Sequence, residues 1–347
     1  MLAARFDAPR RLTLTELDDP VPREGQALIA VEACGICGSD LHVFHHGYGV
    51  PAGQVLGHEF SGRVVDAPGV DGLVPGDPVV VRPVIPCGAC DRCRAGDVQL
   101  CRAPAPRIIG FGAAGAFAEL VLVPTAIRGQ TVFPLPSGVT TRAAALTEPL
   151  AVALHAVRLA GPVEGATALV LGAGAIGLGV VRFLRLRGAG TIIAADPSAL
   201  RRGRALELGA DAALDPAADD VVVAVRERTG PWALGRGARA DVTFDCAGAP
   251  GTLRAAIDAT RQRGIVVIAA MGTTRVELRP DVIATKELVL RGSMAYIDEF
   301  GEVLARIADG SVDPERFVTH TFPLRDIQAA FETQGDADAA VKVLVTP

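Results

Sequence analysis

A glycine-rich turn between a predicted strand and a predicted helix limits the fold of this chain more than any other feature. The sequence GATALVLGAGAIGLGVVRFLRLRGAG, residues 165–190, predicts a buried strand, a turn and a helix that ends near Gly188. Gly172, Gly174 and Gly177 form the pattern G-x-G-x-x-G in the turn. Glycines at this spacing let the backbone approach a pyrophosphate at the N-terminus of the helix. We expect a dinucleotide site here; the alternative is a turn that binds nothing.

An acidic residue follows at the distance that such a site requires. Asp196 ends the next predicted strand, nineteen residues after Gly177. A carboxylate at this place holds the ribose 2'-hydroxyl of the dinucleotide. Because it also repels a 2'-phosphate, Asp196 favours NAD over NADP.

The chain predicts two domains of different character. Strands are expected within 191–195, 238–248 and 263–272, with helices at 199–208 and 251–262 between them. This alternation is typical of a doubly wound parallel sheet, the Rossmann arrangement. Earlier in the chain, short β runs bounded by Gly and Pro predict a β-rich domain. These runs are 25–33, 76–84 and 115–124.

The fold class is therefore α/β with a second, β-rich domain. The Pro-rich stretch VFPLPSGVTT, residues 132–141, leads into the helix that opens the Rossmann part. We place the β-rich domain at 1–147 and the dinucleotide domain at 148–287. Residues 288–347 are expected to return to the first domain.

Composition excludes several classes of protein. A length of 347 residues suits two domains, and half of the residues are hydrophobic. The net charge of -5 gives no reason to expect a nucleic acid or an anionic membrane as partner. The first twelve residues, MLAARFDAPRRL, contain no apolar core typical of a signal peptide. We expect a cytoplasmic protein.

Four cysteines lie close together in PCGACDRCRAGDVQLC, residues 86–101. In a reducing compartment such spacing argues against disulfides and favours metal binding. Four thiolates around one tetrahedral ion leave no open position, as in structural zinc sites. The alternatives are an iron–sulfur cluster and a chance grouping at the surface. The predicted ligands are Cys87, Cys90, Cys93 and Cys101.

A second set of candidate ligands lies near the N-terminus. The segments CGICGSDLH (34–42) and GHEF (57–60) supply Cys37, His58 and Glu59. A thiolate, an imidazole and a carboxylate are typical of catalytic zinc, which keeps one position open for water or substrate. Spacing alone does not bring these residues together, and a lone histidine in an apolar stretch is often a core residue.

Several motifs together resemble one family. CGICGSDLH, GHEFSG, PGDPVVV, the four-cysteine segment, EPLAVALHA and GAGAIG are similar to zinc-dependent medium-chain dehydrogenases/reductases over nearly the whole chain. The resemblance implies a GroES-like catalytic domain with an inserted Rossmann domain. The segments SMAYIDEF and VDPERFVTHTFPL are similar to the butanediol end of the branch that includes threonine, butanediol and sorbitol dehydrogenases.

The resemblance also implies a role for each metal ligand. Cys37 and His58 would hold catalytic zinc, with Glu59 or Glu148 of the EPL motif as a third ligand that alternates with water. Asp40 would orient His58. The zinc would lower the pKa of the alcohol, and hydride would pass to the nicotinamide.

The proton and the cofactor have their own implied residues. Ser39 would take the alcohol proton and pass it toward solvent through the ribose and His42. Ile176 would pack against the nicotinamide side of NAD, and Arg201 would lie near its adenosine. A simple cap for Ser39 and solvent-exposed positions for His42 and Arg201 are the alternatives.

The predicted function is thus the NAD-linked oxidation of a secondary alcohol, diol or polyol to a ketone, with two zinc ions per chain. An L-threonine-type or other hydroxy-metabolite dehydrogenase is the nearest alternative. A zinc-free, NADPH-dependent reductase would lack the cysteine and histidine sets, and a non-catalytic protein would bind NAD without turnover. We expect a small-molecule alcohol as partner and a homo-oligomer, either a dimer or a tetramer.

Overall fold

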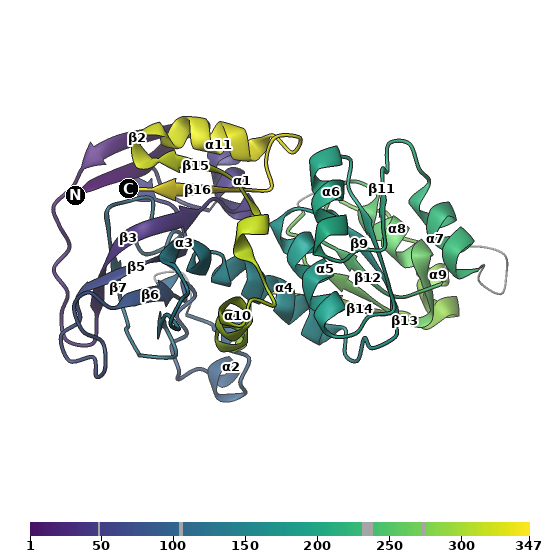
Figure 1. Ribbon diagram of the computed structural model, residues 1–347, viewed down its shortest axis with the longest axis horizontal. Coiled ribbons are helices and arrows are strands. Elements are labelled where there is room, and N and C mark those ends of the chain that lie inside the picture. The colour runs from purple at the N-terminus through teal and green to yellow at the C-terminus, as the bar shows by residue number, and fades with distance from the viewer. Residues whose placement is uncertain (48, 104–106, 231–238, 273–274) are drawn as a thin grey trace. The chain divides into compact units, whose positions relative to one another are not determined.

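The computed structural model describes residues 1–347 except for 48, 104–106, 231–238 and 273–274. The chain forms two compact units, each with its own sheet (Figure 1). The first unit contains Met1–Glu148 and Ile297–Pro347, and the second contains Pro149–Tyr296. No helix among the described residues is long and apolar enough to span a lipid bilayer.

The first unit is built on a mainly antiparallel sheet with the strand order β15-β16-β3-β5-β6-β8, and β7 also pairs with β3. A smaller sheet has the order β2-β1-β4. The strands are β1 (Leu2–Ala8), β2 (Arg11–Glu16), β3 (Ala27–Gly35), β4 (Gln54–Val55), β5 (Glu59–Asp66), β6 (Pro78–Val81), β7 (Leu120–Val123), β8 (Val132–Pro134), β15 (Val318–Pro323) and β16 (Lys342–Thr346).

The first unit also contains short helices. They are α1 (Gly38–His46), α2 (Asp91–Arg94), α3 (Thr141–Ala144), α10 (Glu299–Ala308) and α11 (Ile327–Gly335), with 3-10 turns at Val98–Leu100, Pro314–Arg316 and Leu324–Asp326. Helix α4 (Thr147–Leu159) begins in the first unit and continues into the second.

Aromatic side chains join helices α1 and α11 to the core of the first unit. The ring centroid of Phe331 lies 5.2 Å from that of Phe44 and 5.4 Å from that of Phe117. All three rings are buried, and such pairs stabilise a core beyond the area that they bury. The C-terminal segment is therefore anchored to the N-terminal part of the chain.

The second unit contains a six-stranded parallel sheet with the order β11-β10-β9-β12-β13-β14. In chain order this is 3-2-1-4-5-6, the order of doubly wound dinucleotide-binding folds. The strands are β9 (Thr167–Leu171), β10 (Thr191–Ala195), β11 (Ala212–Leu214), β12 (Ala240–Asp245), β13 (Thr260–Ile268) and β14 (Val289–Gly292). The helices are α5 (Ala175–Leu186), α6 (Ala199–Leu208), α7 (Val221–Thr229), α8 (Thr252–Ala259) and α9 (Pro280–Lys286). The predicted fold class is confirmed.

One predicted helix boundary is wrong. The helix expected over 251–262 ends at Ala259, and the following residues already belong to β13. Thr260 is fully buried, and its hydroxyl donates to Thr243 Oγ1 at 2.8 Å. The ammonium of Lys286 donates to the carbonyls of Ile257, Asp258 and Thr260 at 2.8–2.9 Å, so a buried cation ends the helix. The strand predicted within 238–248 is β12, and residue 238 lies outside the described residues.

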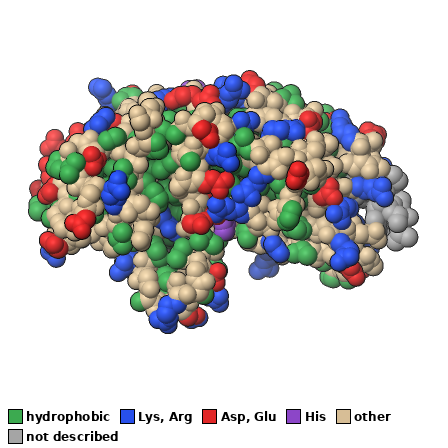
Figure 2. Space-filling model, turned by 60° about the horizontal axis from the view of Figure 1, so that its bottom comes forward, with side chains coloured by type: hydrophobic (Ala, Val, Ile, Leu, Met, Phe, Trp, Pro, Cys, Tyr) green, Lys and Arg blue, Asp and Glu red, His purple; other side chains and the backbone are tan. Residues whose placement is uncertain are grey.

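Acidic and basic side chains are interspersed on the face shown in Figure 2. Exposed pairs include Arg63–Glu32 and Arg185–Asp211, each at 2.7 Å. Ion pairs of this exposed kind stabilise a fold by only about 0–1 kcal/mol each. The buried ion pair of the first unit, described below, is a different case.

Candidate zinc and dinucleotide sites

The start of helix α1 positions the first candidate ligand. Cys37 is the N-cap residue of α1, and its backbone N–H donates to Asp40 Oδ2 at 2.9 Å. A carboxylate at this position caps a free backbone donor and favours the helix N-terminus. Asp40 is fully buried, so its second oxygen stays inside the unit.

The pairing of β3 with β5 brings the other two candidates to Cys37. In this antiparallel ladder Gly35 lies opposite Glu59. Cys37 comes two residues after Gly35 and His58 comes directly before Glu59, so both lie beyond the same end of the ladder. A Cβ atom at position 35 would collide with Glu59 Oε2, so glycine at this position leaves room for the Glu59 carboxylate. The ligand atoms of Cys37, His58 and Glu59 all lie within 4.8 Å of one another. We name these three residues the open cluster.

Asp40 dominates the electrostatics of His58. Its Oδ1 lies 3.4 Å from His58 Nδ1, a long distance for a hydrogen bond and a close one for two charges. Burial alone would lower the pKa of His58, but the charge of Asp40, assisted by Cys37, raises it well above its ordinary value. The other ring nitrogen of His58, Nε2, lies 3.5 Å from Ser39 Oγ.

A buried lysine completes the surroundings of the open cluster. Lys342, the first residue of β16, donates from Nζ to both carboxylate oxygens of Glu59, at 2.8 and 2.6 Å. It also donates to the Ile36 carbonyl at 3.0 Å. Burial lowers the pKa of Lys342, but the charges of Glu59 and Cys37 outweigh this and raise it above its ordinary value. No sequence motif pointed to Lys342; its one signal is a lone lysine in the apolar run AAVKVLV.

Two further candidate residues of the first unit, Glu148 and His42, are not part of the open cluster. Glu148 is largely buried at the start of α4, and its charge contributes to the raised pKa of Lys342. It does not belong to the three-residue group that lies within 4.8 Å. His42 lies on α1, three residues after Ser39, and is exposed.

The four cysteines of 87–101 gather around one point. Cys87 Sγ lies 3.9 Å from Cys93 Sγ, and Cys90 Sγ lies 4.0 Å from Cys101 Sγ. These distances exclude disulfides, whose sulfurs are about 2.0 Å apart. Thiolates bound to one tetrahedral zinc at about 2.3 Å are about 3.8 Å apart, so the sulfurs are close to the spacing that a zinc ion requires.

The pKa values of the cysteine thiols also favour the binding of a cation. Backbone N–H groups of Arg102 and Cys93 point at the sulfur of Cys90 and lower its pKa to about 6. Burial, together with the neighbouring Cys90, raises the pKa of Cys93 to about 12. Four thiolates in this loop therefore need a positive ion to ionise together.

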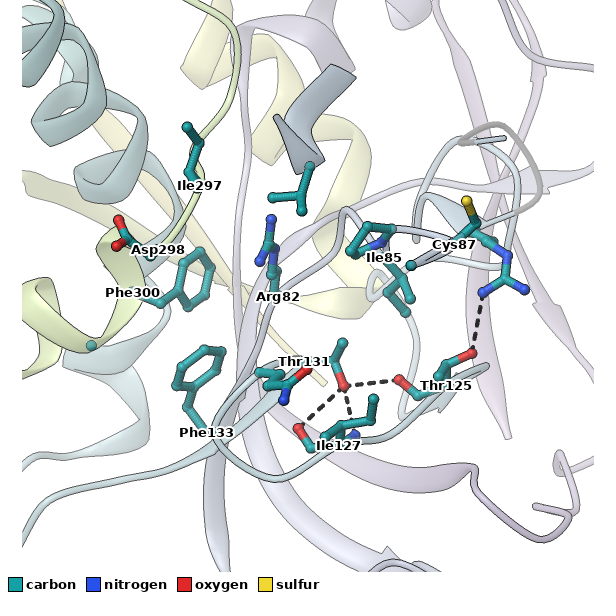
Figure 3. Close-up of a pocket in the computed structure, with 17 residues that line it drawn as sticks. Arg82, Ile85, Cys87, Thr125, Ile127, Thr131, Phe133, Ile297, Asp298 and Phe300 are labelled. Atoms are coloured by element: carbon teal, nitrogen blue, oxygen red, sulfur yellow. Dashed lines mark hydrogen bonds between the residues drawn. The ribbon is translucent and has the colours of Figure 1, made fainter. Parts of the chain in front are cut away.

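A hollow lies beside the four-cysteine loop (Figure 3). It has a volume of about 490 Å³, and its lining includes Cys87, Arg82 and Ile85. Phe133 and Phe300 form one wall, with ring centroids 5.3 Å apart. Because none of the open-cluster residues lines it, this hollow is separate from the candidate catalytic site.

The glycine turn of the second unit has the geometry of a dinucleotide site. Gly172 follows β9 with φ of +90°, in the left-handed region that favours glycine, and Gly174 is the N-cap residue of α5. A Cβ atom at Gly177 would collide with the carbonyl oxygen of Gly172. Ile176 lies half-buried in the first turn of α5. The helix N-terminus therefore leaves its backbone N–H groups open to an anionic group.

Asp196 directly follows β10, beside this turn. Its Oδ2 accepts from the Ala173 backbone N–H at 2.7 Å, and its Oδ1 accepts from Ser198 N–H at 2.9 Å. Arg201 lies in the first turn of α6, and its Nη1 approaches the Cβ position of Gly174 to 3.9 Å. A carboxylate and a guanidinium thus flank the glycine turn.

Comparison with known proteins agrees with both units. The alcohol dehydrogenase GroES-like domain matches residues 23–137, and the zinc-binding dehydrogenase domain matches residues 175–309. The chain is 34% identical to (R,R)-butanediol dehydrogenase of Bacillus subtilis strain 168, over 100% of both chains.

Two solved structures are similar to the chain over their length. One is a putative zinc-binding dehydrogenase from Sinorhizobium meliloti 1021 bound to NADP, with a TM-score of 0.90, 36% identity, and coverage of 100% of this chain and 99% of that one. The other is a short chain alcohol dehydrogenase from E. coli CFT073 complexed with NADH, with a TM-score of 0.90, 28% identity and the same coverage.

A GroES-like unit joined to a 3-2-1-4-5-6 sheet, with matches that span the chain, defines a zinc-dependent dehydrogenase of the alcohol-oxidising type. The chain belongs to the zinc-dependent medium-chain dehydrogenase family. The predicted family and the predicted oxidation of an alcohol or polyol are confirmed. The zinc-free reductase is set aside.

Proposed function

We propose that the protein oxidises a secondary alcohol, diol or polyol to a ketone at the open cluster, with NAD as the hydride acceptor. The observation that carries this proposal is the convergence of Cys37, His58 and Glu59 within 4.8 Å. A thiolate, an imidazole and a carboxylate suit zinc, and three protein ligands leave one position for the alcohol. When bound, the zinc stabilises negative charge on the alcohol oxygen, and NAD accepts the hydride.

The protein's own residues prepare this site. Asp40 holds Nδ1 of His58 and leaves Nε2 for the metal, the usual arrangement of a ligating histidine. Ser39 Oγ, which lies 3.5 Å from that Nε2, accepts the proton of the alcohol hydroxyl as it releases its own proton toward solvent. His42, one turn further along the same helix and exposed, passes the proton to solvent.

The third protein ligand is Glu59 or Glu148. The grouping within 4.8 Å supports Glu59, whereas its two contacts with Lys342 draw that carboxylate toward the lysine. Zinc content separates the two cases. Glu59→Gln should lower occupancy of the open cluster if Glu59 is the resident ligand, and Glu148→Gln should do so if Glu148 is.

Cys87, Cys90, Cys93 and Cys101 hold a second, structural zinc in this proposal, which makes two zinc ions per chain. Sulfur–sulfur distances of 3.9 and 4.0 Å support it. Elemental analysis of protein purified without chelator should give two zinc ions per chain. One zinc or none would contradict the assignment.

Asp196 supports NAD as the preferred cofactor. It is nearly buried and accepts two backbone N–H bonds beside the glycine turn, so a 2'-phosphate would meet a fixed negative charge. Gly172, Gly174 and Gly177 would receive the pyrophosphate, Arg201 would lie near the adenosine, and Ile176 would pack against the nicotinamide. Equal turnover with NADP and NAD would contradict this role of Asp196.

The decisive experiment for the substrate class is a scan of secondary alcohols, diols and polyols, and of L-threonine, with NADH absorbance as the readout. Turnover of diols or polyols supports the proposal, and turnover of L-threonine alone supports the hydroxy-metabolite alternative. Binding of NAD without turnover of any of them supports a non-catalytic protein. The close likeness to a butanediol dehydrogenase favours the first result.

We further propose a homo-oligomer, a dimer or a tetramer, in the cytoplasm. Seven free cysteines, four of them gathered for a metal, suit a reducing compartment. Light scattering of the purified holoenzyme tests the oligomer, and a monomer at micromolar concentration would contradict it.

A further inference from the structure

Two histidines face solvent on α1, apart from the open cluster and the four-cysteine loop. His42 and His46 are four residues apart, a spacing that places two side chains on the same face of a helix. Their ring centroids lie 5.9 Å apart, with the ring planes at 42°. Both side chains are exposed, so a ligand from solvent reaches them directly.

The neighbouring His45 is held differently. Its ring packs edge-on against Phe44, with centroids 5.2 Å apart at 65°. Its Nδ1 is buried, and burial is the first cause that lowers its pKa, followed by the charge of Arg10. His45 therefore lies beside the pair without the freedom to complete it, which makes it a matched control.

The geometry of the pair suits a metal ion. Two histidines at i and i+4 on a helix are a recurring zinc-binding arrangement. With Zn–N bonds of about 2.1 Å, two imidazoles on one ion have ring centroids roughly 5 Å apart at a tetrahedral angle. The observed 5.9 Å between His42 and His46 is within about 1 Å of this separation.

The position on the helix also favours a cation. His46 is the last residue of α1, and the C-terminal end of a helix carries a partial negative charge. The positive charge of Arg10 opposes cation binding at this end of the helix. The same charge contributes to the lowered pKa of His45. Among the described residues, the groups of three or more ligand atoms within 4.8 Å do not include this pair, so water would complete the coordination shell of an ion bound there.

We propose that His42 and His46 form a third metal site, which binds one exchangeable divalent transition ion such as Ni²⁺ or Zn²⁺. Imidazole is a good ligand for both ions, and two protein ligands hold an ion more weakly than the three or four of the other sites. A consequence rests on the proposed function: an ion on His42 would occupy the nitrogen that passes the substrate proton to solvent, and excess metal would slow alcohol oxidation.

The test is calorimetric titration of the zinc-loaded holoenzyme with Ni²⁺. Wild type should bind one further ion per chain, and His46→Gln should bind it at least tenfold more weakly. His45→Gln should keep the wild-type affinity, because its buried ring takes no part. Equal affinity of wild type and His46→Gln, or no further ion up to millimolar Ni²⁺, would overturn the site.

Activity gives a second, separable readout. Excess Zn²⁺ should slow alcohol oxidation by wild type several-fold and leave His46→Gln largely unaffected. If Ni²⁺ binds to wild type and is lost in His46→Gln, but Zn²⁺ inhibits neither enzyme, the metal site stands and the relay role of His42 is wrong.

Discussion

Lys342 Nζ lies 2.6 and 2.8 Å from the two carboxylate oxygens of Glu59, and both side chains are buried. The two residues are 283 positions apart in the chain. The last strand of the protein thus supplies a positive charge to the candidate zinc site that the N-terminal segment builds. Removal of either partner of a buried ion pair leaves the other charge buried without compensation, which lowers the stability of the fold.

Replacement of the lysine should expose that dependence. Lys342→Met leaves the Glu59 carboxylate buried without its cation, and breaking a buried pair costs about 3–5 kcal/mol of unfolding free energy. Urea unfolding of the zinc-loaded protein measures this loss. The double variant Glu59→Gln/Lys342→Met is the control and should recover much of it, because no unpaired charge remains. A single variant as stable as wild type would contradict the role of the pair.

The same pair predicts a pH dependence. The pKa of Lys342 is raised above its ordinary value of 10.5 in the folded protein, so folding favours the charged form. Its contribution to stability is fully present below pH 10.5 and is lost as the pH rises through the higher pKa of the folded state. The difference in unfolding free energy between wild type and Lys342→Met should therefore stay constant up to about pH 10.5 and shrink above it. If this difference in unfolding free energy shrinks between pH 6 and 9 instead, groups other than Lys342 cause the pH dependence.

Asp40→Asn tests the residue that orients His58. Asparagine still accepts from the Cys37 N–H, so α1 should begin as in wild type, while the negative charge beside His58 Nδ1 is removed. Loss of such a partner typically costs about 10–100-fold in metal affinity or activity. Zinc titration of the open cluster and circular dichroism measure the two effects separately. Unchanged zinc affinity with a normal helix content would mean that Asp40 only caps the helix.

Asp196→Asn should relax the choice between NAD and NADP. The amide oxygen keeps an acceptor for the Ala173 N–H, but the charge that repels a 2'-phosphate is gone. We expect the ratio of kcat/KM for NAD to that for NADP to fall at least tenfold. Asp211→Asn, an exposed carboxylate of the same unit that pairs with Arg185, should leave the ratio unchanged. An equal fall in both variants would point to a general effect of charge.

The sequence identified the candidate zinc ligands, but it did not show that they lie close together in the fold. Cys37, His58 and Glu59 were chosen as candidate ligands from their chemistry, but the register that sets Gly35 opposite Glu59 is what brings them together. That register depends on β-sheet pairing across the chain, which local spacing does not encode. The roles of these residues stay predictions.

Lys342 is the clearest example of a site residue that the sequence did not predict. It lies outside every motif of the family resemblance, and only the pairing of β16 with β3 carries it to Glu59. The doubly wound sheet was predictable because strand and helix alternate locally over its length. The end of α8 was not, since Thr260 and Lys286 set it through contacts made after folding.

In the proposed function, the open cluster holds a catalytic zinc ion and the four-cysteine loop holds a structural one. The most direct test measures zinc content, melting temperature and alcohol oxidation for Cys37→Ser and Cys90→Ser. Cys37→Ser should lose about one zinc per chain and activity by orders of magnitude while the fold persists, because the metal that polarises the alcohol loses a ligand. Cys90→Ser should lose stability or assembly, while the surviving enzyme still binds NAD. An active Cys37→Ser together with a stable Cys90→Ser that transfers no hydride would contradict the assignment.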